Sequence, residues 1–391
     1  MHGLKGDVGR ILGFLLLAKA IVFYSSYEAS RGGNFLYLMS TRWDSQLLEQ
    51  IAQSGYPQNH QAGLYAFSPF YPTIVSLLHY ATGSYWVAAF VLTNVLSFLF
   101  PLLMLKFSNP KAALMISIFP TYALFGTVPY SDSLTLIFLL LSFIFLINKR
   151  NLLAGICLGL AIFNAYNLAY TIPAFIVYIL VERRTHSSVN IKMRNLLVFL
   201  IPLIVVGAGI LAFYQIETGN MFSYFVLEST YWGATIVTPV AQAAWILNTN
   251  GQGWFTNQGW TVLSVRIYPI YWLVRNVIFE AFYAIGAACI LKSNSIGHSS
   301  PNGIATSSGN IVEDPDIRLL FFIFSALVLV PLLFIGGTPS VSIPRLLLPA
   351  FPIFFAYSTR IGKGNWFVVY VVLSLAVTSW ATYSFMEAFF A

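Results

Sequence analysis

The run from Asn195 to Tyr214, NLLVFLIPLIVVGAGILAFY, contains no charged side chain and consists mostly of Leu, Ile, Val and Phe. Each residue of an α-helix rises about 1.5 Å, so about 20 residues cross the roughly 30 Å hydrocarbon core of a bilayer. Lys192 and Arg194 precede the run and Glu217 follows it, so charged residues mark both ends. The stretch predicts a transmembrane helix.

Apolar runs of this kind make up most of the chain. Of its 391 residues, 58% are hydrophobic and 8% are charged, and the mean hydropathy is +0.75. Soluble domains carry about 25% charged residues, so this composition excludes a water-soluble enzyme and a nucleic-acid-binding protein. A membrane β-barrel would show alternating segments of about ten residues, whereas these runs are near-continuous. The sequence predicts an all-α polytopic membrane protein with one domain over residues 1–391.

The charged and sulfur-containing residues agree with this class. The net charge of +7 comes with no long basic tract, so no nucleic-acid partner is expected. Cys157 and Cys289 both lie in apolar runs, which argues against a disulfide or metal framework. Lys19 lies inside the first apolar run, where a cation needs a polar partner or an aqueous cavity, and an acid of the first loop is one candidate partner.

The cations also give a topology. The apolar runs predict eleven spans near 11–28, 86–105, 112–128, 133–148, 152–166, 168–181, 195–214, 269–291, 319–336, 345–359 and 365–386. Every second connection is basic, and the positive-inside rule puts these connections in the cytoplasm. Their cations are Lys5, Arg10, Lys106, Lys111, Lys149, Arg150, Arg183, Arg184, Lys192, Arg194, Lys292, Arg318, Arg360 and Lys363. The N-terminus is then inside and the C-terminus outside, with Arg31, Arg42, Arg266, Arg275 and Arg345 on the outward side.

Three connections are long. The outward loops at about 29–85 and about 215–268 are rich in aromatic residues, which suit both the membrane interface and stacking on sugar rings. The inward loop at about 292–316 is rich in Ser, Asn and Gly and predicts a flexible linker. In the first loop, residues 43–54 predict a helix. Residues 69–82 are too short for a span and predict an interfacial or re-entrant helix.

Asp44 is the first candidate for chemistry, because it begins a helix on the outward side among apolar and aromatic residues. A carboxylate in such surroundings can serve as a general base. The alternative is structural: Thr41 to Asp44 fits a capping box, in which Asp44 bonds back to the start of the helix. Spacing alone leaves both interpretations open.

Two further groups lie on the outward side. Ser131 and Asp132 open a span, where Ser131 suits an N-cap and Asp132 suits the helix dipole. The functional alternative is that Asp132 and Tyr130 orient a substrate or the loop that carries Asp44. Arg345 ends a span, where it would reach lipid headgroups or grip a phosphate with its planar guanidinium. His60 is a lone loop residue, and Asp314-Pro315-Asp316 is interpreted as a solvated turn rather than a metal site. The sequence has no phosphate-binding glycine loop.

These stretches, in order, resemble the PIG-V family, the GPI mannosyltransferase 2 proteins and their prokaryotic relatives, which have the GT-C fold. The resemblance is carried by R-W-D-S (42–45), I-A-x-x-G-Y (51–56), F-S-P-F-Y-P (67–72), I-F-P (118–120), P-Y-S-D-S (129–133), the basic turn at 149–150, T-G-N-M-F-S-Y-F (218–225) with Tyr231-Trp232, and S-I-P-R-L-L-L-P-A-F-P (342–352). The chain departs from the family pattern at 164–167, where N-A-Y-N replaces an Arg-Pro-Thr-Gly-like stretch.

The resemblance implies a glycosyltransferase with about eleven transmembrane helices. It would move a sugar, typically mannose, with inversion from a polyprenyl (dolichyl) phosphate to a lipid, glycolipid or other extracytoplasmic acceptor. No cofactor or metal would be required. Asp44 would be catalytic, and the substrate-binding residues would be Arg42, Trp43, Tyr71, Tyr130, Ser131, Asp132, Glu228 and Arg345.

The expected location is a prokaryotic cell membrane with the site outside, or the ER membrane in a eukaryote. The alternative function is a transporter or flippase of a lipid-linked sugar, for which internal repeats and helices broken near the midplane would be expected.

Overall fold

The computed structural model describes residues 2–57, 62–107, 109–182, 188–248, 261–262, 265–266, 268–292, 314–361 and 364–386. Most of the predicted inward linker at 292–316 therefore lies outside the described residues, as do His60, Arg183, Arg184 and Lys363. The second outward loop is described only in part.

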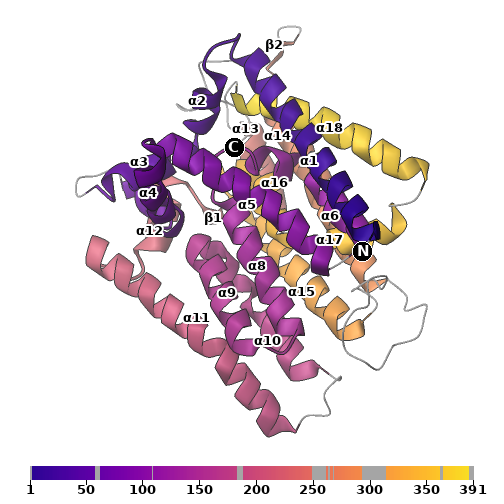
Figure 1. Cartoon of the computed structure of the whole chain (residues 1–391). Helices are drawn as coiled ribbons and strands as arrows, with labels where there is room; N and C mark the ends of the chain where they lie inside the picture. The colour runs from indigo at the N-terminus through magenta and orange to yellow at the C-terminus, as the bar shows by residue number, and fades with distance from the viewer. Residues whose placement is uncertain are drawn as a thin grey trace.

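The described chain is almost entirely helical, which confirms the prediction of an all-α polytopic membrane protein (Figure 1). Its helices, with 3₁₀ helices written η, are α1 His2–Ala29, α2 Phe35–Ser40, α3 Asp44–Ser54, η1 Ala62–Ala66, α4 Phe70–Thr82, α5 Tyr85–Phe107, α6 Pro110–Ser117, α7 Pro120–Phe125, α8 Asp132–Ile147, α9 Asn151–Asn164, η2 Tyr166–Thr171, α10 Ile172–Val181, α11 Val189–Thr218, α12 Ser223–Tyr231, α13 Pro239–Asn248, α14 Tyr268–Leu291, α15 Pro315–Leu332, η4 Thr338–Ser342, α16 Ile343–Leu346, η5 Leu348–Ala350, α17 Ile353–Arg360 and α18 Asn365–Met386.

Each predicted span corresponds to a helical segment, but the segments differ in length. Within the described residues, six helices are long and apolar enough to cross a membrane, and the bent pair Thr338–Ala350 and Ile353–Arg360 makes up to seven. Asp132–Ile147, Asn151–Asn164 and Tyr166–Val181 are shorter apolar helices. The count of eleven spans therefore stays a prediction.

Two spans that were predicted as continuous are broken. The run at 112–128 divides into α6 and α7 because Phe119, the residue before Pro120, has extended backbone with ψ of 130°. A residue before proline is sterically driven out of the helical region. The run at 345–359 bends by 74° between the segments that end at Ala350 and begin at Ile353, where Pro349 and Pro352 interrupt the helix.

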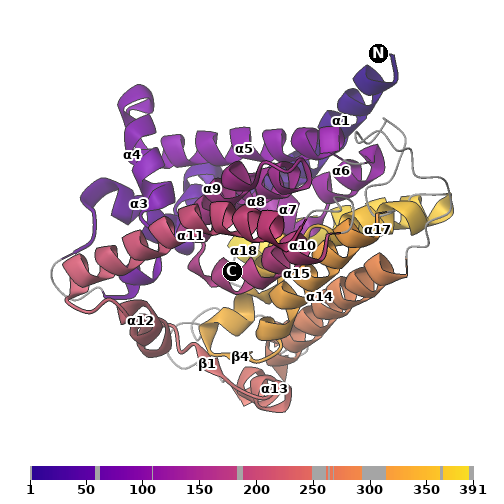
Figure 2. The same ribbon diagram turned by 90° about the horizontal axis from the view of Figure 1, so that it is seen from below.

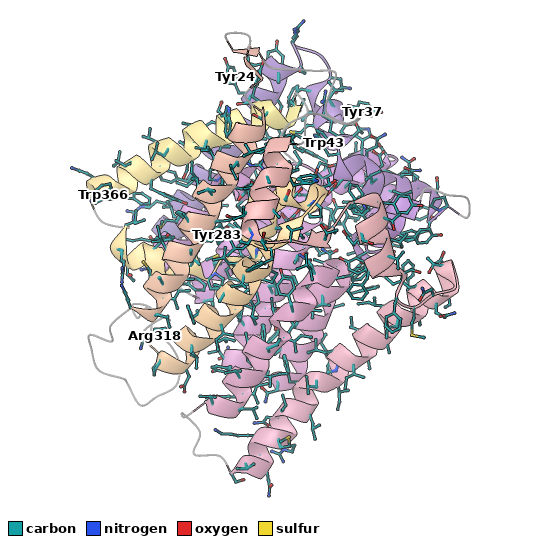
Figure 3. The ribbon with its side chains drawn as sticks, turned by 180° about the vertical axis from the view of Figure 1, so that it is seen from behind. Tyr24, Tyr37, Trp43, Tyr283, Arg318 and Trp366 are labelled. Atoms are coloured by element: carbon teal, nitrogen blue, oxygen red, sulfur yellow. The ribbon has the colours of Figure 1, made fainter. Side chains whose placement is uncertain are left out.

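The first outward loop is helical, as predicted. The segment predicted at 43–54 is α3, and the segment predicted at 69–82 is α4. Figures 1 and 2 show α3 and α4 together at one end of the bundle, away from the N-terminus, while α11 and α18 run along its margins. In Figure 3 Trp43, just before α3, and Arg318, in α15, lie well apart from each other.

The described part of the chain also contains four strands of two residues each. β1 Thr235–Ile236 pairs antiparallel with β4 Ile335–Gly336, and β2 Thr261–Val262 pairs with β3 Val265–Arg266. Gly337 follows β4 and has φ of +77°. It lies so close to Gly233 that an added Cβ would be 2.0 Å from the Gly233 carbonyl oxygen. This contact ties the second outward loop to the segment that leads to α16.

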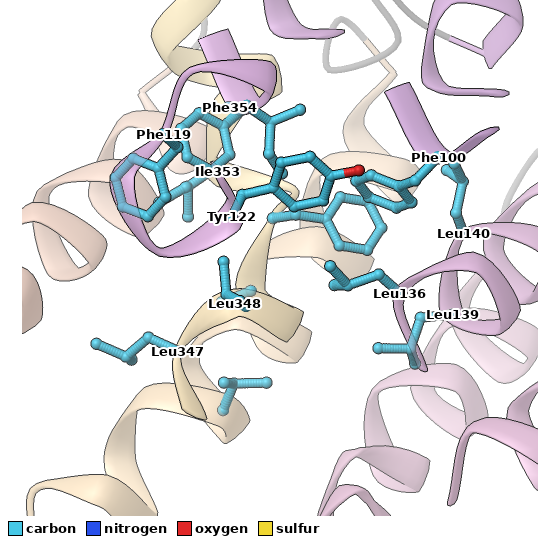
Figure 4. Packing of buried hydrophobic residues seen from close by; sticks show 14 of the residues in the cluster. Phe100, Phe119, Tyr122, Leu136, Leu139, Leu140, Leu347, Leu348, Ile353 and Phe354 are labelled. Atoms are coloured by element: carbon cyan, nitrogen blue, oxygen red, sulfur yellow. The ribbon is translucent and has the colours of Figure 1, made fainter. Parts of the chain in front are cut away.

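The packing of α7 against the segment from α16 to α17 places two distant parts of the sequence beside each other. Phe119 and Phe354 pack edge to face with ring centroids 5.0 Å apart, and Phe100 of α5 packs in the same way on Phe351 at 5.2 Å. Figure 4 shows Phe100, Phe119 and Phe354 together with Tyr122 and the leucines of α8. This core fixes α16 next to the end of α7, which is where the candidate site lies.

Candidate active site

The centre of the site is an ion pair between Asp44 and Arg345. Arg345 Nη1 donates to Asp44 Oδ2 across 301 residues of sequence. The two side chains are 16% and 17% exposed, so the pair is sheltered but still reachable from solvent. Asp44 is the first residue of α3, and Arg345 lies in α16. The two residues that the sequence nominated as base and phosphate contact are therefore direct neighbours.

The geometry contradicts the capping-box interpretation of Asp44. Helix α3 begins at Asp44 with Trp43 as its N-cap, so Asp44 stands at the first helical position instead of the third. The Thr41 hydroxyl donates to the Tyr37 carbonyl at 2.9 Å, at the end of α2. The capping prediction was wrong because the chain turns at Trp43, which leaves the Asp44 carboxylate to meet Arg345.

Tyr130 holds both members of the pair. Its hydroxyl oxygen accepts the backbone N–H of Asp44 at 3.3 Å, and its ring lies 5.0 Å from the Arg345 guanidinium carbon. The Phe125 ring lies 5.7 Å from the same carbon. Aromatic faces attract a guanidinium, and more strongly where water is excluded. Tyr130 is 1% exposed, so its place is set by packing.

Arg42 and Trp43 form the turn that leads into α3. Trp43 has φ of 55°, a left-handed backbone that non-glycine residues seldom adopt. Its indole Nε1 donates to the Phe385 carbonyl at 3.2 Å, which fastens the turn to the end of α18. Arg42 is half-buried, and its carbonyl accepts the N–H of Ser45 at 3.1 Å. Both residues directly precede Asp44 in the chain.

Ser131 and Asp132 stand at the start of α8, beside the pair. Asp132 is partly exposed and lies close enough to Asp44 and Arg345 to interact electrostatically with both. The Ser131 carbonyl accepts the Asn164 side-chain amide at 2.9 Å, and that amide also donates to Thr135 Oγ1 at 2.6 Å. Ser131 is the N-cap residue of α8 and Asp132 lies in its first turn, as the capping and dipole interpretations expect, but within the described residues the Ser131 side chain makes no capping hydrogen bond.

Tyr71 lies farther from the pair than the motif suggested. It is 1% exposed, and its hydroxyl bonds to Thr93 Oγ1 at 2.8 Å and to the Ala89 carbonyl at 3.2 Å. Thr93 Oγ1 in turn donates to the Tyr130 carbonyl at 3.1 Å. A buried, occupied hydroxyl has no surface for a substrate, so Tyr71 supports Tyr130 through Thr93 in this structure.

Glu228 contributes a second carboxyl group from α12. It is half-buried, and burial raises the pKa of Glu228 to about 7. The negative charge of Asp44 raises it further, and a hydrogen bond with Tyr224 opposes the shift. The second outward loop therefore reaches the surroundings of Asp44, and Glu228 is poised to change charge near neutral pH.

Two cations, Lys19 and Arg275, are buried within helices. Lys19 has polar partners, as predicted, but they are three neutral acceptors in α5 and in the connection after α7 and not the candidate acid of the first loop. Arg275 was counted with the outward loops, but it is 3% exposed within α14 and donates to the Val341 carbonyl. The sequence missed both roles because acceptors of this kind are backbone carbonyls and amides, which no side-chain pattern reveals.

The acidic, histidine and cysteine side chains of the chain are dispersed in its described part. Among the residues that the structure describes, no group of three or more His, Cys, Asp or Glu side chains is placed to hold a metal ion. Asp314 of the Asp-Pro-Asp stretch is the N-cap of α15, and its Oδ1 accepts the N–H groups of Asp316 and Ile317 at 2.8 and 3.0 Å. The stretch is therefore the start of a helix in which Asp316 is 8% exposed, and not the solvated turn that was predicted.

Comparison with known proteins gives one structural likeness to report. No family model matches the chain, and no curated protein matches it. The chain is similar to the crystal structure of ArnT from Cupriavidus metallidurans bound to undecaprenyl phosphate, with a TM-score of 0.49 and 12% sequence identity. The similarity covers 98% of this chain and 77% of that one. At this level the likeness assigns no activity or substrate to the chain.

Proposed function

We propose that this chain is a membrane-embedded glycosyltransferase of the GT-C type. It moves a sugar, with mannose as the first choice, from a polyprenyl phosphate to an acceptor hydroxyl on the extracytoplasmic side. The observation that carries the proposal is the sheltered pair of Asp44 and Arg345, flanked by Tyr130 and Asp132. The resemblance to the PIG-V family supplies the donor class and the sugar.

The reaction needs two charged groups, and the pair supplies both. The acceptor oxygen bonds to the anomeric carbon while its proton passes to Asp44, which acts as general base. The bond from that carbon to the phosphate oxygen breaks on the opposite face, so the configuration inverts. The polyprenyl phosphate leaves with the bonding electrons, and Arg345 stabilises its negative charge. A phosphate leaving group needs little acid assistance, so one carboxylate suffices.

The resting ion pair is compatible with this role. Without substrate, each partner neutralises the other, which limits the cost of keeping two charges in a sheltered site. When the donor arrives, its phosphate becomes a second anion for Arg345, whose guanidinium offers five N–H donors. Asp44 then turns one oxygen toward the acceptor. Tyr130 keeps the start of α3 in place during this exchange because it accepts the Asp44 N–H.

The test is sugar transfer from radiolabelled polyprenyl-phosphate mannose to a membrane lipid extract, with and without EDTA. The purified full chain is compared with Asp44→Asn and with Glu49→Gln. Glu49 is a matched control because it lies on the same helix and its carboxylate accepts from Gln53 at 2.9 Å. Transfer by the wild type and Glu49→Gln, lost in Asp44→Asn and unaffected by EDTA, is the expected result.

Other results would change the assignment in defined ways. Equal transfer by all three proteins removes Asp44 from the mechanism. A loss caused by EDTA alone contradicts metal independence. If an intact lipid-linked sugar moves across the liposome membrane and no sugar is transferred from any polyprenyl-phosphate donor, the transporter is favoured instead.

A further inference from the structure

Lys19 is a cation enclosed in the protein. It lies in the middle of α1 and is 3% exposed. Its ammonium donates to Asn94 Oδ1 at 2.8 Å, to the Gly126 carbonyl at 2.7 Å and to Thr127 Oγ1 at 3.2 Å. It also lies 5.2 Å from the centroid of the Phe98 ring. All the acceptors are neutral.

This arrangement is costly, and it leaves nothing for a ligand. Taking a charged ammonium out of water requires compensating hydrogen bonds, and charged groups at membrane depth are rare for that reason. An ammonium has three N–H donors, and each of them has an acceptor here. Lys19 is therefore a fixed internal contact and not a site for a phosphate.

The contact holds the connection between α7 and α8, residues 126–131. Asn94, which accepts from Lys19, donates its amide to the Thr127 carbonyl at 3.0 Å. The neighbouring Thr93 donates to the Tyr130 carbonyl at 3.1 Å. The connection is thus fastened to α1 and α5 at its start and to α5 at its end.

We propose that Lys19 is a positioning residue for the Asp44–Arg345 pair. It fixes the Gly126–Thr127 end of the connection, so that Tyr130 at the other end stays against the Asp44 backbone and beneath the Arg345 guanidinium. Without the ammonium, the Gly126 carbonyl loses its partner and the connection gains freedom. Tyr130 then spends less time in the position that orients Asp44.

The first readout is structural and does not require activity. Hydrogen–deuterium exchange is measured on the full chain in detergent for the wild type, Lys19→Met and Ser25→Ala. Ser25 is a matched control because it is a buried polar residue of α1, and its hydroxyl bonds to Ser379 of α18 at 2.9 Å. Lys19→Met is expected to raise exchange in residues 126–131 by about tenfold or more, the equivalent of one lost charged hydrogen bond. Ser25→Ala should leave that segment unchanged.

The second readout rests on the proposed glycosyl transfer. Lys19→Met should lower kcat by about threefold to tenfold and change the donor KM by less than about threefold, because Arg345 still meets the phosphate. If Lys19→Met does not fold, Thr127→Val removes one of the three contacts with little change in shape and should shift both readouts in the same direction.

The two readouts fail separately. Unchanged exchange in 126–131 for the folded variants overturns the positioning role, whatever the activity. A rise in exchange spread evenly over all helices also overturns it, because that result indicates general destabilisation. If the wild type transfers no sugar, the proposed function fails while the exchange result still decides the role of Lys19.

Discussion

Replacing Arg345 separates a catalytic ion pair from a structural one. Arg345→Gln removes the guanidinium and keeps a polar side chain of similar reach. A hydrogen bond to a charged group contributes about 1.5–3 kcal/mol, which corresponds to about a 10- to 150-fold loss of affinity. If Arg345 contacts the donor phosphate, the donor KM should rise by a factor in that range. The acceptor KM should stay near its wild-type value.

The effect on stability follows from the burial of the pair. An exposed ion pair contributes about 0–1 kcal/mol, and removing one partner of a fully buried pair costs about 3–5 kcal/mol. The side chains of Arg345 and Asp44 are 16% and 17% exposed, between these limits. Arg345→Gln should therefore destabilise the protein by about 2 kcal/mol, because the Asp44 charge is left without its partner.

Asp44→Asn should give the opposite kinetic pattern. An amide cannot accept the acceptor proton, so kcat should fall by about 10²- to 10⁴-fold, the usual contribution of general base catalysis. The donor KM should stay level or fall, because Arg345 no longer shares its charge with a carboxylate. The two variants together thus divide the pair into a group that acts on kcat and a group that acts on KM.

The assay is initial-rate transfer from radiolabelled polyprenyl-phosphate mannose by the purified chain in liposomes, with donor and acceptor varied in turn. Glu49→Gln and the exposed Arg360→Gln serve as charge-matched controls. Wild-type kcat and KM in both Asp44→Asn and Arg345→Gln would refute the reasoning and reduce the pair to a structural contact. A rise in the acceptor KM alone for Arg345→Gln would contradict its role on the donor phosphate.

Three further outcomes are expected. Tyr130→Phe should lower kcat about threefold to tenfold and leave the donor KM unchanged, because only the hydroxyl contact with Asp44 is lost. Tyr130→Leu should also raise the donor KM, because the ring beneath Arg345 is lost. A larger rise in donor KM for Tyr130→Phe than for Tyr130→Leu would contradict this. Burial raises the Glu228 pKa from 4.5 to about 7, so its contribution to stability is full below pH 4.5 and is lost as the pH rises through about 7. Glu228→Gln should flatten the Tm profile between those values, and an unchanged slope would count against it. In intact cells a membrane-impermeant maleimide should label Ser54→Cys, and it should label Asn148→Cys only after permeabilisation. Background labelling should be low because Cys157 and Cys289 are each 7% exposed. The reverse labelling pattern would invert the predicted topology.

The helices could be predicted because their cause lies in the sequence. A long apolar run must form internal backbone hydrogen bonds in a bilayer, so its position reveals the helix. The breaks were harder to predict, because Pro120 and Pro349 lie inside apolar runs whose composition still suits a span. Proline is tolerated in membrane helices when neighbouring groups satisfy the freed carbonyls, so its presence alone does not locate a break.

The site also contains residues that could be predicted from the sequence and residues that could not. Asp44 and Arg345 are charged residues in an apolar chain, so each was visible as an exception that needs a reason. Thr93, Asn164 and Phe125 are ordinary residues of apolar helices, and their roles depend on which helices pack together. Asn164 was noted only as a departure from the family pattern, yet its amide holds the Ser131 carbonyl at 2.9 Å. Side-chain type can identify the reacting groups, but tertiary contacts decide which residues support them.

The backbone conformation of Trp43 shows how a tertiary contact determines the direction of a reacting side chain. A non-glycine residue in the left-handed region costs about 1–3 kcal/mol and persists only where surrounding contacts hold it. Here the indole bond to Phe385 does so, at 3.2 Å. A capping box would place Asp44 at the third helical position with its carboxylate bonded back to the start of the helix. The turn at Trp43 instead directs that carboxylate to Arg345 and the Asp44 N–H to Tyr130. The strain therefore lies where the chain exchanges a local capping bond for a contact 301 residues away, which is the expected place for a functional constraint.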